Sequence, residues 1–224
     1  MPAPGRNFHN SRTVRTLVSD RPSGAGFCLW LTGLPSSGKT TLAGEISARL
    51  RERGFATELL DGDEVRRGLS ADLGFDRASR EAHATRVMFV AKLLVRHGVI
   101  PIVALISPYR RSREKARAEI GGFVEVYVST PLEVCEARDV KGLYRRARAG
   151  QIKEMTGVDD PYEVPEAPEI VLDTTSASPA QSATHLMREL VRLGWLPRSE
   201  RTISGASSTS PALSAGTESA VDRP

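Results

Sequence analysis

The 224-residue sequence is poor in cysteine and aromatic residues and has no long apolar run. Its two cysteines, Cys28 and Cys135, supply neither a disulfide framework nor a metal-ligand spacing, which fits a reducing cytoplasm. No stretch approaches the roughly 18 apolar residues of a membrane span, and the N-terminus lacks the apolar segment of a signal peptide. We therefore expect a cytoplasmic protein with no membrane partner.

The chain also lacks a large excess of charge of either sign. The net charge is only +4, and Lys and Arg are interleaved with Asp and Glu along the chain. This pattern does not favour a nucleic-acid partner, and a small anionic substrate explains the excess equally well. Residues 198–224 contain almost no large apolar side chain, so we expect a disordered tail there. Residues 1–22 are expected to be a poorly ordered arm, which leaves one domain at residues 23–197.

A glycine-rich segment at residues 33–40 fits the phosphate-binding pattern G-x-x-x-x-G-K-[ST]. An apolar run at residues 27–31 precedes it, and apolar residues at helical spacing follow it, which is the strand-loop-helix context that the pattern requires. In this geometry backbone N–H groups and Lys39 hold phosphates, and the Thr40 hydroxyl ligates Mg²⁺. The sequence therefore predicts a nucleoside triphosphate site formed by Gly33, Leu34, Pro35, Ser36, Ser37, Gly38, Lys39, Thr40 and Thr41.

Short β-type runs alternate with helical patterns along the rest of the domain. Further strands are predicted at residues 56–60, 99–105, 123–128 and 170–172, and a long helix at about 79–97. Capping boxes are predicted at the helix starts Thr130-Pro131-Leu132-Glu133 and Ser178-Pro179-Ala180-Gln181. This alternation predicts an α/β fold, a P-loop NTPase-type parallel sheet of about five strands flanked by helices.

Residues 61–63 and 106–110 are predicted to border the same cleft as the phosphate loop, because ligands of parallel sheets bind at the carboxyl ends of the strands. Asp61 and Asp63 follow the second strand and provide the carboxylates that a kinase needs near its metal and its acceptor hydroxyl, although a simple turn is the alternative. The polar, basic and glycine-punctuated residues 139–163 are interpreted as a mobile lid, with a solvated surface loop as the alternative.

An ordered set of segments from about residue 26 to 172 resembles the adenylylsulfate kinase family. The set comprises Leu60-Asp61-Gly62-Asp63, Arg66, Leu73-Gly74-Phe75, Arg80, Ile106-Ser107-Pro108-Tyr109-Arg110, and residues 134–139, 141–144 and 156–163. The resemblance implies transfer of the γ-phosphate of MgATP to the 3′-hydroxyl of adenosine 5′-phosphosulfate (APS), which gives the activated sulfate donor PAPS. It also implies a homodimer.

The resemblance implies a role for each matching residue. Lys39, Asp61, Asp63 and Ser107 are the catalytic candidates. Asp63 would accept the hydroxyl proton, and Asp61 with Thr40 would hold Mg²⁺. Ser107 occupies a position regarded in the family as a possible phosphoserine, but it has no activating neighbour in the sequence, so we expect direct transfer. The implied substrate contacts are Asp63, Arg66, Phe75, Arg80, His83, Ile106, Ser107, Lys141, Leu143, Met155 and Thr156.

Two of these positions depart from the family pattern. His83 stands where the family usually has a substrate-contacting Asn, and Met155 stands where an aromatic residue helps to sandwich the adenine. These departures leave open a related kinase that acts on the 3′-hydroxyl of a different nucleotide. A non-catalytic P-loop regulator is disfavoured, because Lys39, Asp61 and Asp63 are all present.

Overall fold

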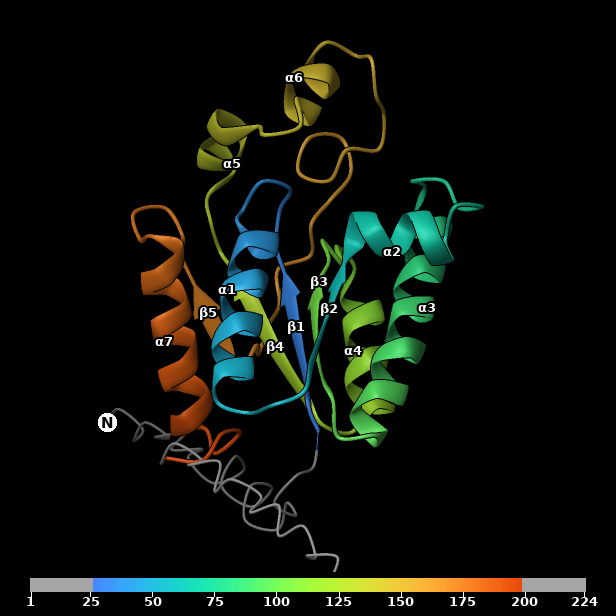
Figure 1. Cartoon of the computed structure of the whole chain (residues 1–224). Helices are drawn as coiled ribbons and strands as arrows, with labels where there is room; N and C mark the ends of the chain where they lie inside the picture. The colour runs from blue at the N-terminus through green and yellow to red at the C-terminus, as the bar shows by residue number, and fades with distance from the viewer. Residues whose placement is uncertain (1–25, 199–224) are drawn as a thin grey trace, which may run out of the picture.

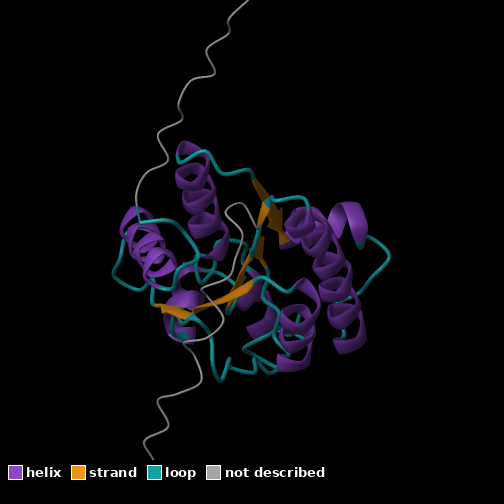
Figure 2. Cartoon of the chain, turned by 90° about the horizontal axis from the view of Figure 1, so that it is seen from below, coloured by secondary structure: helices purple, strands orange, loops and turns teal. Residues whose placement is uncertain are grey.

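A parallel five-stranded sheet lies between two layers of helices (Figures 1 and 2). The computed structural model describes residues 26–198. The strands run in the order β2-β3-β1-β4-β5 and all pair in parallel, which confirms the fold predicted from the sequence. Their bounds are β1 Cys28–Thr32, β2 Thr57–Asp61, β3 Ile100–Ala104, β4 Phe123–Val128 and β5 Ile170–Leu172.

Alternate residues of β1 enter two separate hydrophobic cores, because successive side chains of a strand point to opposite faces of the sheet. Leu29 and Leu31 pack in the core that includes α1 and α7, whereas Cys28 and Trp30 pack in the core that includes α3 and α4. The helices are α1 Lys39–Glu52, α2 Gly62–Leu69, α3 Arg77–Arg96, α4 Arg110–Ile120, α5 Leu132–Arg138, α6 Leu143–Arg148 and α7 Pro179–Arg192.

Of the two capping boxes predicted from the sequence, one is present and the other is absent. Ser178 and Gln181 form the predicted capping box at the start of α7. The box predicted at Thr130 is wrong, because α5 has Pro131 as its N-cap and no side-chain capping bond. The hydroxyl of Thr130 is buried and donates instead to the carbonyl of Ser37, at 3.2 Å. A buried carbonyl needs a donor, and this long-range requirement decides where the Thr130 side chain points.

The region at residues 139–163 contains α6 and shares a small hydrophobic core with α5. Cys135, Tyr144 and Met155 are buried together in this core. The Tyr144 hydroxyl donates to the carbonyl of Pro35 at 3.1 Å, so the region is tied to the phosphate loop. Figure 1 shows α5 and α6 above the carboxyl ends of the strands. Movement of this region as a lid stays a prediction.

The predicted arm at residues 1–22 lies outside the described residues, as does the predicted tail apart from Arg198. Within residues 26–198, no helix is long and apolar enough to cross a bilayer.

Candidate active site

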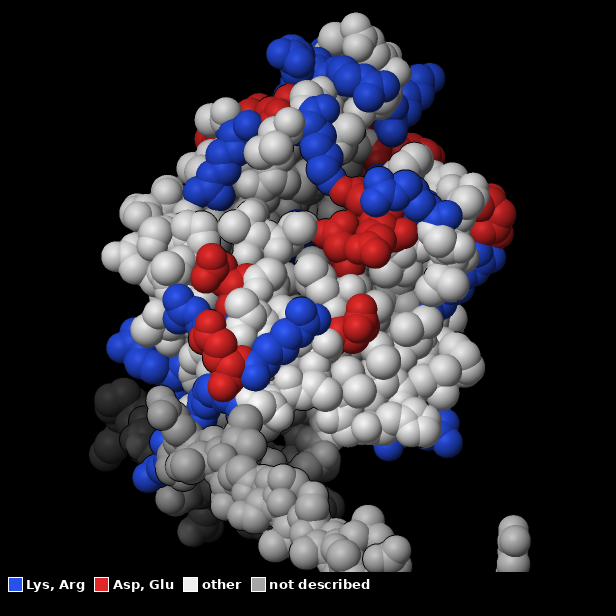
Figure 3. Space-filling model, in the orientation of Figure 1, with Lys and Arg blue, Asp and Glu red and all other residues white. Residues whose placement is uncertain are grey.

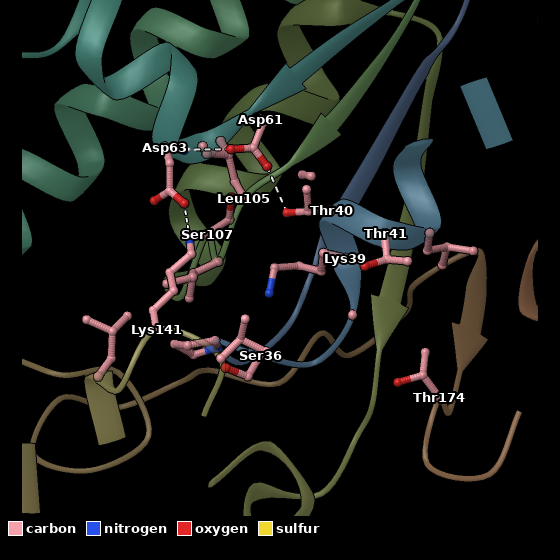
Figure 4. Close-up of a pocket in the computed structure, with 18 of the residues that line it drawn as sticks. Ser36, Lys39, Thr40, Thr41, Asp61, Asp63, Leu105, Ser107, Lys141 and Thr174 are labelled. Atoms are coloured by element: carbon pink, nitrogen blue, oxygen red, sulfur yellow. Dashed lines mark hydrogen bonds and ion pairs between the residues drawn. The ribbon is translucent and has the colours of Figure 1, made fainter. Parts of the chain in front are cut away.

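A cavity of about 750 Å³ lies at the carboxyl edge of the sheet. It brings together residues from the phosphate loop, the ends of β2 and β3, helix α3 and the segment between α5 and α6 (Figure 4). Most of the residues predicted from the sequence line it, namely Pro35, Ser36, Gly38, Lys39, Thr40, Thr41, Asp61, Asp63, Arg66, Arg80, His83, Ile106, Ser107, Lys141 and Leu143. Gly33, Leu34, Ser37, Phe75, Met155 and Thr156 do not line it.

The phosphate loop curls around the ammonium group of Lys39. The Nζ atom donates to the carbonyls of Gly33 at 2.9 Å and Leu34 at 2.6 Å, and to the Ser37 hydroxyl at 3.2 Å. Only a glycine fits at position 33, since an added Cβ would lie 2.5 Å from the carbonyl oxygen of Val128. Burial lowers the pKa of Lys39 to about 7. This lysine therefore gains charge readily when an anion approaches.

Asp61 joins the second strand to the phosphate loop. Its Oδ2 accepts from the Thr40 hydroxyl at 2.7 Å, and its Oδ1 accepts from the backbone N–H of Asp63 at 3.0 Å, which caps α2. Asp61 therefore both stabilises the turn into α2 and presents a carboxylate to the Thr40 hydroxyl. A carboxylate beside a hydroxyl fits Mg²⁺, which typically takes one or two carboxylates and completes its shell with phosphate oxygens and water. No group of three or more acidic, His or Cys side chains suited to a metal occurs among the described residues.

Asp63 lies in the first turn of α2 and forms an ion pair with Lys141, which comes from the segment between α5 and α6. Both side chains are more than half exposed. Asp139 shapes this segment, because its carboxylate oxygens accept from the N–H groups of Tyr144 and Arg145, each at 3.0 Å. Figure 3 shows basic side chains gathered in the region above the cavity and a group of acidic side chains below them.

Arg66 and Arg80 converge on the aromatic ring of Phe75. Their guanidinium carbons lie 4.6 and 5.8 Å from the ring centroid. Arg66 donates to the carbonyl of Gly74 at 2.8 Å, and Arg80 donates to those of Phe75 and Glu154, both at 2.6 Å. Phe75 itself is 58% exposed. The two cations and the exposed ring form one wall beside the cavity, suited to an anion attached to a flat base.

His83 is buried on α3 and lines the cavity. Its Nδ1 pairs with the Ser70 hydroxyl at 3.0 Å, whereas its buried Nε2 has no hydrogen-bond partner. Burial, together with the charges of Arg66 and Arg86, lowers the pKa of His83 to about 4. The imidazole is therefore neutral at pH 7 and brings a polar atom, not a cation, to this side of the cavity.

Ser107 adopts a backbone conformation that is rare outside glycine, with φ of +43°. Its hydroxyl accepts from the indole N–H of Trp30 at 3.1 Å, and its carbonyl accepts from the buried Arg113 at 2.6 Å. Strained residues persist where the surroundings hold them, and these two contacts do so. Sequence analysis assigned no role to Trp30 or Arg113: Trp30 is 77 residues from Ser107 in the chain, and Arg113, six residues from Ser107, gave no motif signal.

Met155 and Thr156 do not line the cavity. Met155 is buried beside Tyr144, and the Thr156 hydroxyl donates to Asp160 at 3.3 Å. Substrate contact by these two residues stays a prediction. The cavity also includes Arg138 and Thr174, which sequence analysis did not single out.

Comparisons with known proteins agree with this geometry. A sequence model of the family described as adenylylsulphate kinase matches residues 25–173. The adenylyl-sulfate kinase of Synechococcus sp. strain JA-3-3Ab is 52% identical over 171 residues, which cover 76% of this chain and 97% of that protein. The probable adenylyl-sulfate kinase of Pyrococcus abyssi is 51% identical over 172 residues, covering 77% of this chain and 99% of that protein.

Solved structures give a similar result. An APS kinase of Mycobacterium tuberculosis, in complex with AMPPNP and APS, has a TM-score of 0.71 and 41% identity, and the match covers 75% of this chain and 98% of that one. A hexameric APS kinase from Thiobacillus denitrificans has a TM-score of 0.59 and 37% identity, and the match covers 76% of this chain and 30% of that one.

Proposed function

Since this chain belongs to the adenylylsulfate kinase family, we infer that it transfers the γ-phosphate of ATP to the 3′-hydroxyl of APS and so forms PAPS. One observation carries the inference. The phosphate loop with Lys39, the Thr40–Asp61 pair and the carboxylate of Asp63 all border the same cavity. Phosphoryl transfer needs these parts in one place, because catalysis depends mainly on positioning and charge stabilisation.

On the donor side, we propose that residues 33–41 bind the phosphates of ATP through backbone N–H groups and Lys39. Thr40 and Asp61 would hold Mg²⁺, which supplies positive charge to the phosphate oxygens when bound. The contacts that Lys39 makes with loop carbonyls place its ammonium group at the centre of this loop. Lys39 would stabilise the negative charge on the phosphoryl group during transfer.

On the acceptor side, we propose that Asp63 takes the proton of the 3′-hydroxyl as the bond to phosphorus forms. Arg66 and Arg80 would bind the phosphosulfate, and the exposed ring of Phe75 would stack on the adenine. His83, Ile106 and Ser107 would line the remainder of the acceptor pocket, and Lys141 with Leu143 would cover it. The Asp63–Lys141 ion pair supports this arrangement, because it joins the covering segment to the carboxylate.

A homodimer and a cytoplasmic location remain proposals. Phe89 and Leu93 are exposed one turn apart on α3, and such apolar side chains suit a contact between subunits. The APS kinase from Thiobacillus denitrificans, of which the match covers 30%, is hexameric, and this gives partial support to an assembly of subunits. The described cysteines, Cys28 and Cys135, are both free, in keeping with a reducing compartment.

The reaction is tested with purified protein, MgATP and APS. We expect PAPS and ADP in equal amounts, with ADP release dependent on APS. Competition with AMP and with other nucleoside 5′-derivatives tests the alternative raised by His83. A 3′-phosphorylated product made faster from another nucleotide would replace APS as the substrate, and the absence of any such product would contradict kinase activity.

Binding of MgADP is expected to take up close to one proton at pH 8. With a pKa of about 7, most Lys39 side chains are neutral at pH 8 in the free protein, and bound phosphate favours the charged form. The affinity should therefore fall as the pH rises above 7. Calorimetry in buffers of different ionisation enthalpy measures the proton count. Lys39→Arg should show little uptake, since guanidinium stays charged. Equal heats in all buffers for the wild type would contradict the shift.

Ser107→Ala is expected to retain at least about a tenth of the wild-type kcat, because transfer to a positioned hydroxyl needs no covalent step. The Ser107 hydroxyl accepts from the indole N–H of Trp30, which cannot act as a base. Incubation with radiolabelled ATP alone should leave the protein unlabelled. A stable phosphoserine at this position would show that direct transfer is wrong.

A further inference from the structure

Thr174, the second residue after β5, lies on the side of the phosphate loop opposite Asp63 and Lys141 (Figure 4). Its hydroxyl donates to the backbone carbonyl of Ser37 at 2.8 Å. The Thr130 hydroxyl lies 2.8 Å from that of Thr174 and also reaches the Ser37 carbonyl, at 3.2 Å. Two threonines from different strand ends thus converge on one peptide group of the loop.

Arg138 binds both the hydroxyl and the carbonyl of Thr174. One guanidinium nitrogen donates to Thr174 Oγ1 at 3.0 Å, and the other donates to the Thr174 carbonyl at 2.6 Å. Because Oγ1 accepts from Arg138, its single proton is left for the Ser37 carbonyl or for Thr130 Oγ1, each 2.8 Å away. Chains of this kind, in which each bond polarises the next, hold their members more firmly than isolated bonds do.

The Ser37 carbonyl and the Gly38 N–H belong to the same planar peptide and point in opposite directions. Gly38 has φ of +94° and no Cβ, so its φ is less restricted than that of other residues, and the bond from the Leu42 N–H to the Gly38 carbonyl restrains only the helix side of this residue. Gly38 lines the cavity, whereas Ser37 is buried and does not line it, and the Thr174 hydroxyl holds the Ser37 carbonyl. Fixing the carbonyl therefore directs the Gly38 N–H toward the place where phosphate oxygens bind.

We propose that Thr174 is a positioning residue for phosphate binding. It holds the carbonyl of Ser37, so that the Gly38 N–H already points toward the phosphate site before the nucleotide binds. Less conformational entropy is then lost when the nucleotide binds. Thr130 supports it from the end of β4. The proposal rests on the ATP-binding part of the proposed function and is independent of the identity of the acceptor.

The test compares Thr174→Val with Thr174→Ser and with Thr175→Val, a matched control at an exposed neighbouring threonine. Calorimetry measures the Kd of MgADP and of inorganic triphosphate, which has no base. Thr174→Val should weaken both about 3- to 10-fold, as expected for the loss of one hydrogen bond. Thr174→Ser and Thr175→Val should stay within about twofold of the wild type, and the Kd of APS should not change.

Several outcomes would overturn the proposal. Unchanged MgADP binding by Thr174→Val is one, and equal weakening by Thr175→Val is another. Weaker MgADP binding with unchanged triphosphate binding would place the effect at the base, through Arg138. Should Thr174→Val not fold, Thr130→Val tests the same carbonyl and must weaken both ligands. A wild type that binds MgADP but does not phosphorylate APS would contradict the acceptor assignment and leave this proposal standing.

Discussion

Lys39→Ala should lower kcat for PAPS formation by about 10³-fold or more, because it removes the cation that faces the transferring phosphoryl group. The ammonium group is central to the phosphate loop, where Gly33 and Leu34 hold it through their carbonyls. The initial rate of ADP release at saturating APS and MgATP measures the loss.

Two comparison variants make this result specific to the charge. Lys39→Met keeps most of the side-chain length and should lose activity equally. Lys92→Ala removes a lysine on α3 that is paired with Glu119 away from the cavity, and its rate should not change. Thermal unfolding of each variant checks that the fold is intact. A near-normal rate in Lys39→Ala would show that phosphoryl transfer occurs elsewhere.

Asp63→Asn should lower kcat by about 10² to 10⁴, the usual contribution of a general base, while the KM for APS changes much less. The substitution preserves side-chain volume and removes the negative charge together with the ability to take a proton. It also weakens the pair with Lys141, but exposed ion pairs contribute about 0–1 kcal/mol, so the fold should tolerate the change. Steady-state kinetics with APS as the varied substrate separate the two parameters.

Asp72→Asn is the matched control for this change, because Asp72 is an exposed carboxylate that pairs with Arg86 and does not line the cavity. Its kcat should equal that of the wild type. If Asp63→Asn kept its kcat and bound APS much more weakly, Asp63 would contact the substrate in the ground state and another group would take the proton.

The sequence by itself determined the layers, the parallel sheet and the donor side of the site. These features depend on short-range patterns. A buried parallel strand is apolar without interruption. The phosphate loop is a strand-loop-helix motif whose contacts join residues close in sequence. Asp61 and Asp63 could be placed at the cavity because a strand end fixes them to one edge of the sheet.

Only the tertiary structure decided which side chains support that site. Thr130 was predicted to cap its own helix, yet its hydroxyl joins Thr174 at a carbonyl about ninety residues earlier in the chain. The substrate contact predicted for Met155 stays a prediction, but its burial in a core with Tyr144 and Cys135 was not indicated by the local sequence. In both cases the side chain's direction depends on which distant groups are buried next to it. Local patterns fix the path of the backbone, but satisfying buried polar groups and filling cores depends on contacts that exist only after folding.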